Sequence, residues 1–400
     1  MTKPHPVKPP AKSPAQSPQA RWTVMQVIPN LGAGGAEQTA VDMTEALTKA
    51  GHRAIVVSHG GPRVAEIEKY GGIHITLPVH SKNPLVIWLN SLRIERLIHK
   101  YKVDIVHARS RAPAWSCYLA TLKSKSTSPA HFITTCHAPF NIGNEWKRRY
   151  NSSIIRAERV IANSQFVADY LRSQYEVDQS KIRVIPRGIP IERFDPARVI
   201  AERMHQMAQN WRIPDGGRII LLPGRLTRWK GQSVLIEAMS LIKDQNIYCV
   251  LVGDDQGRSE YRQELEAQIH ALGLDSRVRL LDHVQDMAVA YGISDIVISA
   301  SIEPEGFGRV AVEAQAMGRP VIATDIGGSR ETIIPNQTGW LIPPNDPVIL
   351  AQAIDFVLTL TDQERQNLIQ TAIPHVRMNF SKELMAARTM DVYREVMTER

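Results

Sequence analysis

The sequence predicts an α/β protein with two doubly wound parallel-sheet domains. Short apolar and β-branched runs alternate along the chain with stretches that carry apolar residues at helical spacing, which is typical of parallel sheets covered by helices. At 400 residues the chain is too long for one hydrophobic core, so two such domains are expected. The expected strands are 24–28, 54–58, 73–77, 105–107, 132–135, 160–163 and 182–185 in the first half, and 218–222, 248–253, 278–281, 295–299, 321–324 and 340–342 in the second.

Glycine and proline mark the boundary between the two expected domains, because they interrupt the pattern between 188 and 216. The first twenty residues hold six prolines and three lysines but no apolar block. They are expected to form a disordered tail and not to act as a secretory signal. We therefore expect a Pro-rich tail at 1–20, a Rossmann-like domain at 21–190, a second at 191–377, and a C-terminal helix at 378–400.

Charge and cysteine content narrow the class of protein. The chain is 22% charged and 43% hydrophobic with a net charge of +8, as in a soluble globular protein. Residues 1–190 carry a net +14 and residues 191–400 a net −6, so the first half favours anionic partners: nucleic acid, anionic lipid or phosphate-bearing substrates. Three widely spaced cysteines predict neither disulfides nor a metal knuckle and fit a reducing cytoplasm. No apolar run is long enough to span a bilayer.

Ligands of open parallel sheets lie beyond the carboxyl ends of the strands, so binding and catalytic residues are expected just after each strand. After the first strand, Gly34 and Gly35 precede a helix, which leaves backbone amides open to an anionic group. The turn is not a complete G-x-G-x-x-G and no acid closes the second strand, which argues against NAD; packing of a tight turn is an equal alternative. His137 directly follows another expected strand and can hydrogen-bond a sugar hydroxyl or a leaving phosphate, although a lone histidine is more often structural.

Two cations follow the first strand of the second domain. Arg225 and Lys230 lie in its loop, before a glycine and a helix. Arginine offers bidentate hydrogen bonds and lysine a mobile point charge, so the pair predicts a diphosphate site. The alternative is a solvated basic loop, which we expect for the neighbouring Arg228.

The most specific element spans residues 299–313. Glu305 lies in the loop before a helix and Glu313 about one turn inside it, so both can face one cleft. Gly306 and Gly308 leave amides free at the helix N-terminus, which favours phosphate. Carboxylates can accept hydrogen bonds from the hydroxyls of a sugar and a ribose; the alternative is a pair of acids placed for the helix dipole.

Together these segments resemble the family 4 retaining glycosyltransferases of the GT-B fold, of the type that acts on bacterial glycans and lipopolysaccharide. The resemblance runs from Val24 to the end of the chain. It rests on Gly34-Gly-Ala-Glu37, Gly51-His52, His137, Ala162-Asn-Ser164, Gly188-Ile189, Gly224-Arg225, Lys230-Gly231, Glu305-Gly-Phe-Gly308, Glu313 and Gly327-Gly328. Arg187 departs from the family pattern, which more often has asparagine there.

The resemblance implies a role for each matching position. The second domain would bind the nucleotide-sugar donor, UDP- or GDP-linked, and the first domain the acceptor, with the last helix crossing back to the first domain. The residues implied in catalysis are His137, Arg225, Lys230 and Glu305; those implied in donor binding are Gly34, Gly35, Arg225, Lys230, Gly306, Phe307, Gly308 and Glu313.

The expected reaction needs no metal and no cofactor. No Asp-x-Asp motif lies in a plausible metal loop, so Arg225, Lys230 and the helix amides would stabilise the charge on the departing diphosphate. The resemblance implies retention through a front-face displacement, in which the leaving phosphate helps to deprotonate the acceptor.

The acceptor is predicted less sharply. Trp146, Arg148 and Arg149, with Arg156 and Arg159 nearby, form a basic and aromatic stretch that could rest on anionic headgroups while reaching a lipid-linked glycan such as a lipopolysaccharide or polyprenyl-phosphate sugar. A solvated helix and a soluble acceptor are the alternative. We expect a cytoplasmic protein, either free or peripheral at the inner face of the cytoplasmic membrane. A nucleotide-sugar epimerase or hydrolase of the same fold, or a non-catalytic nucleotide-binding scaffold, are rival functions; nucleic acid is not an expected partner because no aromatic stacking platform accompanies the charge.

Overall fold

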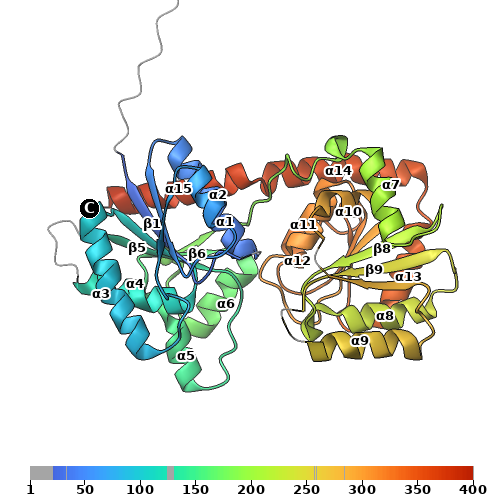
Figure 1. Cartoon of the computed structure of the whole chain (residues 1–400), viewed down its shortest axis with the longest axis horizontal. Helices are drawn as coiled ribbons and strands as arrows, with labels where there is room; N and C mark the ends of the chain where they lie inside the picture. Colours follow the sequence, from blue (N-terminus) through green and yellow to red (C-terminus); the bar gives the residue numbers. More distant parts are fainter. Residues whose placement is uncertain are drawn as a thin grey trace, which may run out of the picture.

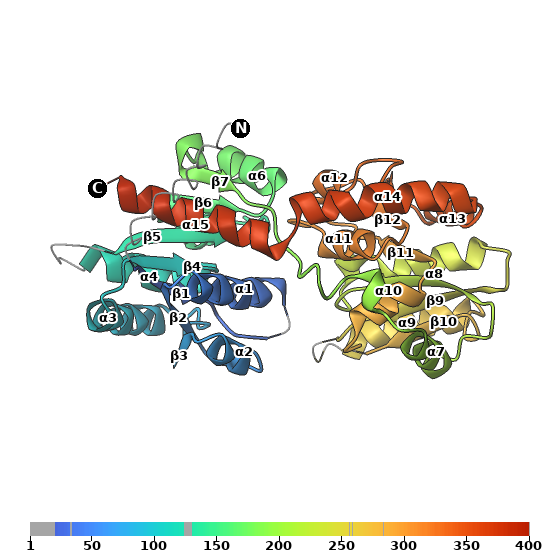
Figure 2. The same ribbon diagram turned by 90° about the horizontal axis from the view of Figure 1, so that it is seen from above.

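The structure, a computed structural model, describes residues 21–32, 34–123, 130–255, 257, 259–282 and 284–399. The tail expected at 1–20 lies outside the described residues. The described chain forms two α/β lobes that lie side by side, with the last two helices along one flank of both (Figures 1 and 2).

The first lobe is built on a seven-stranded, all-parallel sheet in the order β3-β2-β1-β4-β5-β6-β7. Its strands are β1 (Thr23–Val27), β2 (Arg53–Ser58), β3 (Ile73–Thr76), β4 (Ile105–Ala108), β5 (His131–Cys136), β6 (Arg159–Ala162) and β7 (Ile182–Val184). Its helices are α1 (Gly35–Lys49), α2 (Val64–Lys69), α3 (Pro84–Tyr101), α4 (Arg111–Lys123), α5 (Glu145–Asn151) and α6 (Gln165–Tyr175), with 3-10 turns η1 (Ser152–Arg156) and η2 (Gln179–Lys181).

The second lobe is built on a six-stranded, all-parallel sheet in the order β10-β9-β8-β11-β12-β13. Its strands are β8 (Arg218–Pro223), β9 (Ile247–Val252), β10 (Val278–Leu281), β11 (Ile296–Ser299), β12 (Val321–Thr324) and β13 (Trp340–Ile342). Its helices are α7 (Ala201–Asn210), α8 (Gln232–Leu241), α9 (Ser259–Ala271), α10 (Met287–Ile293), α11 (Arg309–Ala316), α12 (Ser329–Thr332), α13 (Pro347–Leu358) and α14 (Asp362–Asn379), with 3-10 turns η3 (Pro196–Arg198) and η4 (Arg228–Lys230). The last helix of the chain is α15 (Lys382–Thr398).

Both sheets have buried central strands because helices cover both faces. Every residue of β1, β4, β11 and β12 is buried, as expected for continuous apolar runs in a parallel sheet. In each sheet the strand order reverses next to its first strand, between β1 and β4 and between β8 and β11. Loops that diverge at such a point leave a crevice at the carboxyl edge of the sheet, where doubly wound proteins bind ligands. The prediction of two doubly wound domains is confirmed.

The last helix packs on the first lobe although the residues before it belong to the second. The α14 helix ends at Asn379, and Ser381 caps the start of α15 by accepting a hydrogen bond from the Leu384 amide. Tyr393 and its neighbours on α15 share a hydrophobic core with Val24 and Leu47. Figure 2 shows this crossing, with α14 over one lobe and α15 over the other.

The same contact involves His107 of β4. Its Nδ1 lies 2.7 Å from the hydroxyl of Tyr393, and its Nε2 lies 2.6 Å from Oγ1 of Thr135. Burial and nearby positive charge hold the pKa of His107 well below its usual value. His107 is therefore a neutral residue that ties α15 to the first sheet.

Among the described helices, none is long and apolar enough to cross a membrane.

Candidate active site

The loop after β8 places Lys230 at the reversal point of the second sheet. Lys230 ends the 3-10 turn η4, and Gly231 follows with a positive φ of 74°. A β-carbon on Gly231 would lie 1.9 Å from the carbonyl oxygen of Ala300, so only glycine fits where this loop passes the end of β11. The sequence Lys-Gly thus brings the ammonium group to the loop that carries Glu305.

Lys230 and Glu305 form a sheltered ion pair. Nζ of Lys230 lies 2.7 Å from Oε1 of Glu305, and their side chains are only 13% and 14% exposed. The hydroxyl of Ser301 also donates to this carboxylate. Burial raises the pKa of Glu305, but the charge and hydrogen bond of Lys230, the hydrogen bond of Ser301 and the charge of Arg225 outweigh it, so the pKa lies below its usual value. Glu305 is therefore an ionised hydrogen-bond acceptor at neutral pH.

Arg225 and Arg228 lie three positions apart but differ in their contacts. Arg225 is exposed and contributes to the low pKa of Glu305, and within the described part of the chain its guanidinium has no hydrogen bond or ion pair. Arg228, 65% exposed, forms an ion pair with Glu264. Arg225 is thus available to a ligand next to Lys230, whereas Arg228 is an outward-facing surface residue.

Glu313 lies about one turn into α11, and its carboxylate is held by Arg309 and Tyr291. Its Oε1 accepts a hydrogen bond from Nε of Arg309 at 3.1 Å, and its Oε2 accepts one from the Tyr291 hydroxyl at 2.8 Å. The Glu313 carboxylate raises the pKa of Arg309. Glu313 is therefore a fixed carboxylate beside the N-terminus of α11, whose cap residue Gly308 has a φ of 87°.

Phe307, expected among the donor-binding residues, turns its ring away from the mouth of the loop. Phe307 is 4% exposed, and its ring meets that of Phe380 at 5.5 Å in the core of the second lobe. The ring points inward because burying a phenyl group is far more favourable than leaving it at the mouth of a polar loop. Only the backbone of Phe307 can face a ligand there.

His137, Gly34 and Gly35 bring the first lobe to this site. A β-carbon on Gly306 would lie 2.2 Å from the carbonyl oxygen of His137, so the two lobes touch at this point. Both ring nitrogens of His137 are buried and have no hydrogen-bond partner among the described residues. Burial, together with the charges of Arg187 and Arg109, holds its pKa well below the usual value, so the imidazole is neutral. Gly34 caps α1 and Gly35 begins it.

A carboxylate joins the lobes beside the site. Glu331 on α12 accepts hydrogen bonds from the amides of Gln165 and Phe166, both at 2.7 Å. These amides begin α6, where unpaired N–H groups favour an anion. These two hydrogen bonds therefore join the second lobe to the first.

The acceptor-side candidates lie on α5, on the outer surface. Trp146 is 80% exposed, Lys147, Arg148 and Arg149 are exposed, and Nη2 of Arg148 donates to the carbonyl of Gln174 at 3.2 Å. The expectation that Arg159 joins this face is wrong. Arg159 instead forms ion pairs with Glu395 at the end of α15 and with Glu399 just after it, so its charge is neutralised there.

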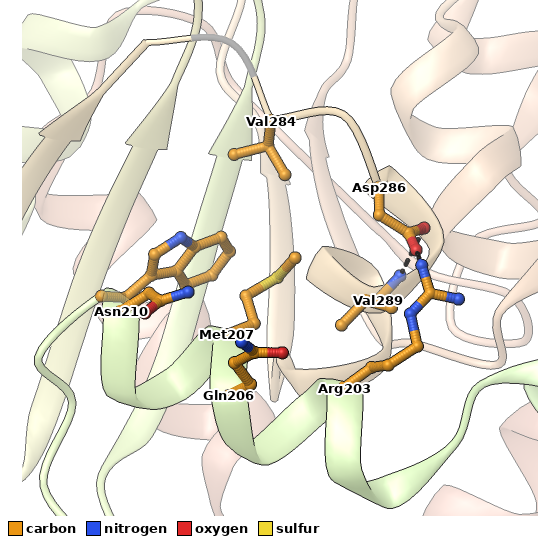
Figure 3. A pocket seen from close by; sticks show the side chains of 8 residues that line it. Arg203, Gln206, Met207, Asn210, Val284, Asp286 and Val289 are labelled. Carbon is orange, nitrogen blue, oxygen red and sulfur yellow. Dashed lines mark hydrogen bonds and ion pairs between the residues drawn. The ribbon is translucent and has the colours of Figure 1, made fainter.

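A groove of about 280 Å³ lies apart from these residues (Figure 3). It is formed by α7 and by the segment that leads from β10 into α10, and an ion pair between Arg203 and Asp286 closes one end. The residues that line it are Arg203, Gln206, Met207, Asn210, Trp211, Val284, Asp286 and Val289. None of the predicted site residues lines this groove.

Sequence reasoning missed three polar residues of the site. Ser301 and Tyr291 donate to the two glutamates, and Glu331 joins the lobes. A serine four residues before Glu305 was a readable signal, because the loop between them is short. Tyr291 and Glu331 lie 22 and about 165 residues from their partners, and no local pattern connects such pairs.

Comparison with known proteins identifies the family of each lobe. A model for Glycosyltransferase Family 4 matches residues 33–193, and a model for Glycosyl transferases group 1 matches residues 204–374. A D-inositol 3-phosphate glycosyltransferase from Salinispora tropica is 29% identical over 62% of this chain, which spans about half (52%) of that relative.

Solved structures resemble nearly the whole chain. A glycosyltransferase from Rickettsia africae is 39% identical, with a TM-score of 0.86 over 95% of this chain and 100% of that one. HepE from Anabaena, solved with UDP and glucose, is 21% identical, with a TM-score of 0.81 over 94% of this chain and 100% of that one, and shows the fold alone. This chain belongs to the GT-B glycosyltransferases, with a Family 4 N-terminal domain and a group 1 C-terminal domain.

Proposed function

We propose that the protein is a retaining hexosyltransferase that moves a sugar from a UDP- or GDP-linked donor to a glycan acceptor. The observation that supports this most is the sheltered pair of Lys230 and Glu305 beside the unpaired Arg225, at the reversal point of the second sheet. The carboxylate fits the hydroxyls of the transferred sugar, and the two cations fit a diphosphate. Glu313, held by Arg309 and Tyr291, would accept hydrogen bonds from the ribose hydroxyls.

The proposed chemistry is electrostatic. As the bond to the diphosphate breaks, negative charge grows on the leaving oxygen, and Lys230, Arg225 and the amides before α11 stabilise it. The neutral imidazole of His137 donates a hydrogen bond to a sugar hydroxyl or to the leaving group. Retention follows if the acceptor attacks from the face that the diphosphate leaves, with the leaving phosphate accepting the acceptor's proton.

Transfer without metal is the first expected result. Purified protein given UDP- and GDP-sugars with candidate acceptors forms a new glycosidic bond with retained configuration, followed by NMR of the product. Excess EDTA changes the rate by less than about twofold, because side-chain cations stabilise the charge that grows on the leaving diphosphate. Loss of activity in EDTA with recovery in Mn²⁺ would contradict the metal-free proposal. An epimerase or hydrolase would instead consume the donor without an acceptor.

The acceptor is proposed to be lipid-linked, at a membrane surface. The exposed Trp146 and the cations of α5 support this, since an aromatic ring and basic side chains suit an anionic interface. A soluble, phosphate-bearing acceptor is the second candidate, which the D-inositol 3-phosphate glycosyltransferase from Salinispora tropica favours.

Vesicle flotation separates the two candidates. We expect the protein to float with anionic vesicles at low salt and to detach as salt screens the charge. Each basic residue near such a surface contributes about 1 kcal/mol, so replacing Arg148 and Arg149 together by Ser lowers partitioning roughly 30-fold. The control is Phe356→Ala, an exposed aromatic on α13 of the second lobe. No salt-sensitive binding by the wild-type protein would favour the soluble acceptor.

A further inference from the structure

The chain crosses between the lobes twice, and the two crossings lie side by side. One follows β7 and the other follows α14. They pair, since the Ile189 amide donates to the carbonyl of Phe380 at 2.8 Å and the Lys382 amide donates to the carbonyl of Ile189 at 3.0 Å. A β-carbon on Gly188 would lie 2.4 Å from Cα of Lys382, so only glycine fits there. Non-covalent contacts therefore decide how the lobes are placed about this paired crossing.

Glu331 makes the hydrogen bonds that join the lobes elsewhere. Away from the crossings, and where both partners are described, the hydrogen bonds between the lobes are the two that Glu331 accepts from the amides of Gln165 and Phe166. The next amide of α6, that of Val167, donates within its own lobe to Oγ of Ser164. The first two amides of this 11-residue helix are thus satisfied by the second lobe, across the place where α12 and α6 face each other (Figures 1 and 2).

On the second lobe, Glu331 is tied to the loop of Glu305. The amide of Gly328, one residue before α12, donates to the Glu305 carbonyl at 2.9 Å. A β-carbon on Gly327 would lie 2.5 Å from the same carbonyl oxygen, and one on Gly328 would lie 2.5 Å from Cα of Phe307. With contacts this close, Glu331 and the loop of Glu305 move as one unit.

On the first lobe, the start of α6 is tied to His137. Nδ2 of Asn163, which lies between β6 and α6, donates to the His137 carbonyl at 2.9 Å. The same carbonyl oxygen faces Gly306 of the second lobe. Both ring nitrogens of His137 lack a partner among the described residues, so no side chain there orients the imidazole. Its place relative to Glu305 therefore depends on how the two lobes are held together.

We propose that Glu331 is a positioning residue that holds His137 of the first lobe against the sugar-binding loop of the second by capping α6 from across the lobe contact. This role rests on the proposed function, because it serves the same transfer. Loss of the Glu331 carboxylate leaves Lys230 and Glu313 in place, so the KM for the donor changes less than about threefold. The value of kcat falls roughly tenfold, within the range for a carboxylate at a helix N-terminus.

Single-molecule energy transfer between two dyes measures the placement of the lobes without an acceptor. The three native cysteines are buried, so the dyes are attached at Lys100→Cys on α3 and Glu237→Cys on α8, which are both exposed. With saturating UDP or GDP we expect one population when Glu331 is present. Glu331→Gln keeps the shape but removes the charge, and it adds a second population with a different transfer efficiency. The control is Arg330→Gln, which breaks a surface ion pair on the same helix and leaves one population.

A further variant separates a link between the lobes from a cap that only stabilises α6. Gln165→Glu in the Glu331→Gln background restores a carboxylate to the first turn of α6, but from its own lobe. We expect the second population and the loss of kcat to remain. Recovery of both by Gln165→Glu would make Glu331 a helix cap only and overturn its positioning role. A single population in Glu331→Gln would overturn that role as well.

Failures of the two proposals are distinguishable. If neither UDP nor GDP raises the unfolding midpoint of the wild-type protein and no nucleotide sugar is consumed, the proposed function is wrong. If the wild-type protein transfers sugar and Glu331→Gln does so at an equal rate, only the positioning role is wrong. A donor KM that rises tenfold in Glu331→Gln with kcat unchanged would assign Glu331 to donor binding and also overturn the positioning role.

Discussion

Replacing Lys230 with Ala lowers kcat by about two orders of magnitude or more, as the loss of one charge contact to a transition state does. The ammonium group lies 2.7 Å from Glu305 and is largely shielded from water, so solvent screens its charge little. Its removal also leaves the Glu305 carboxylate without its main counter-ion. We expect kcat and kcat/KM to fall together in steady-state assays, because the contact strengthens as the diphosphate departs.

The matched control is Arg228→Ala, since this arginine lies on the same 3-10 turn but pairs outward with Glu264. Its rate should stay within about twofold of wild type, because exposed ion pairs contribute little. Equal rates for Lys230→Ala and Arg228→Ala would remove the lysine from the chemistry.

Replacing Glu313 with Ala weakens both the fold and donor binding. Arg309 loses its carboxylate partner, and because its side chain is 30% exposed the loss costs less than the roughly 3 kcal/mol at the low end for fully buried pairs. At roughly 2–4 °C per kcal/mol for a domain of this size, the unfolding midpoint falls by several degrees. The KM for the donor rises at least tenfold, because the ribose hydroxyls lose their acceptor.

A double variant separates the two effects. Arg309→Met combined with Glu313→Met replaces the ion pair by apolar side chains, which often restores stability. We expect a midpoint between those of Glu313→Ala and the wild-type protein, because the buried Tyr291 hydroxyl has lost its acceptor, with donor binding still lost. The control is Glu303→Ala, which removes an exposed acid from the loop before α11 and should change neither the unfolding midpoint nor donor binding. Full donor affinity in the double variant would make Glu313 a purely structural partner of Arg309.

The fold follows from local patterns in the sequence. Each expected strand is found within about two residues of its predicted ends, because a continuous apolar run between glycine or proline breaks has few alternatives in a parallel sheet. The meeting of Lys230 and Glu305 could also be anticipated, since both follow strands that lie side by side at the carboxyl edge.

Side-chain direction and distant partners could not be predicted in this way. The loop around Phe307 indicates a ligand site, but only packing against Phe380 shows that the ring turns inward. Arg159 belongs to a basic run, yet its partners lie more than 230 residues away on the returning helix segment. Arg187 was visible as a departure from the family pattern, but only the structure shows that its Nε is buried without a hydrogen-bond partner.

A crystal structure with bound UDP or GDP gives the sharpest test of the donor site. We expect the diphosphate within about 3 Å of Nζ of Lys230 and of the Arg225 guanidinium, with the ribose at the Glu313 carboxylate. A nucleotide bound elsewhere, for example in the groove beside Trp211, with the loop of Lys230 and Glu305 empty, would contradict it.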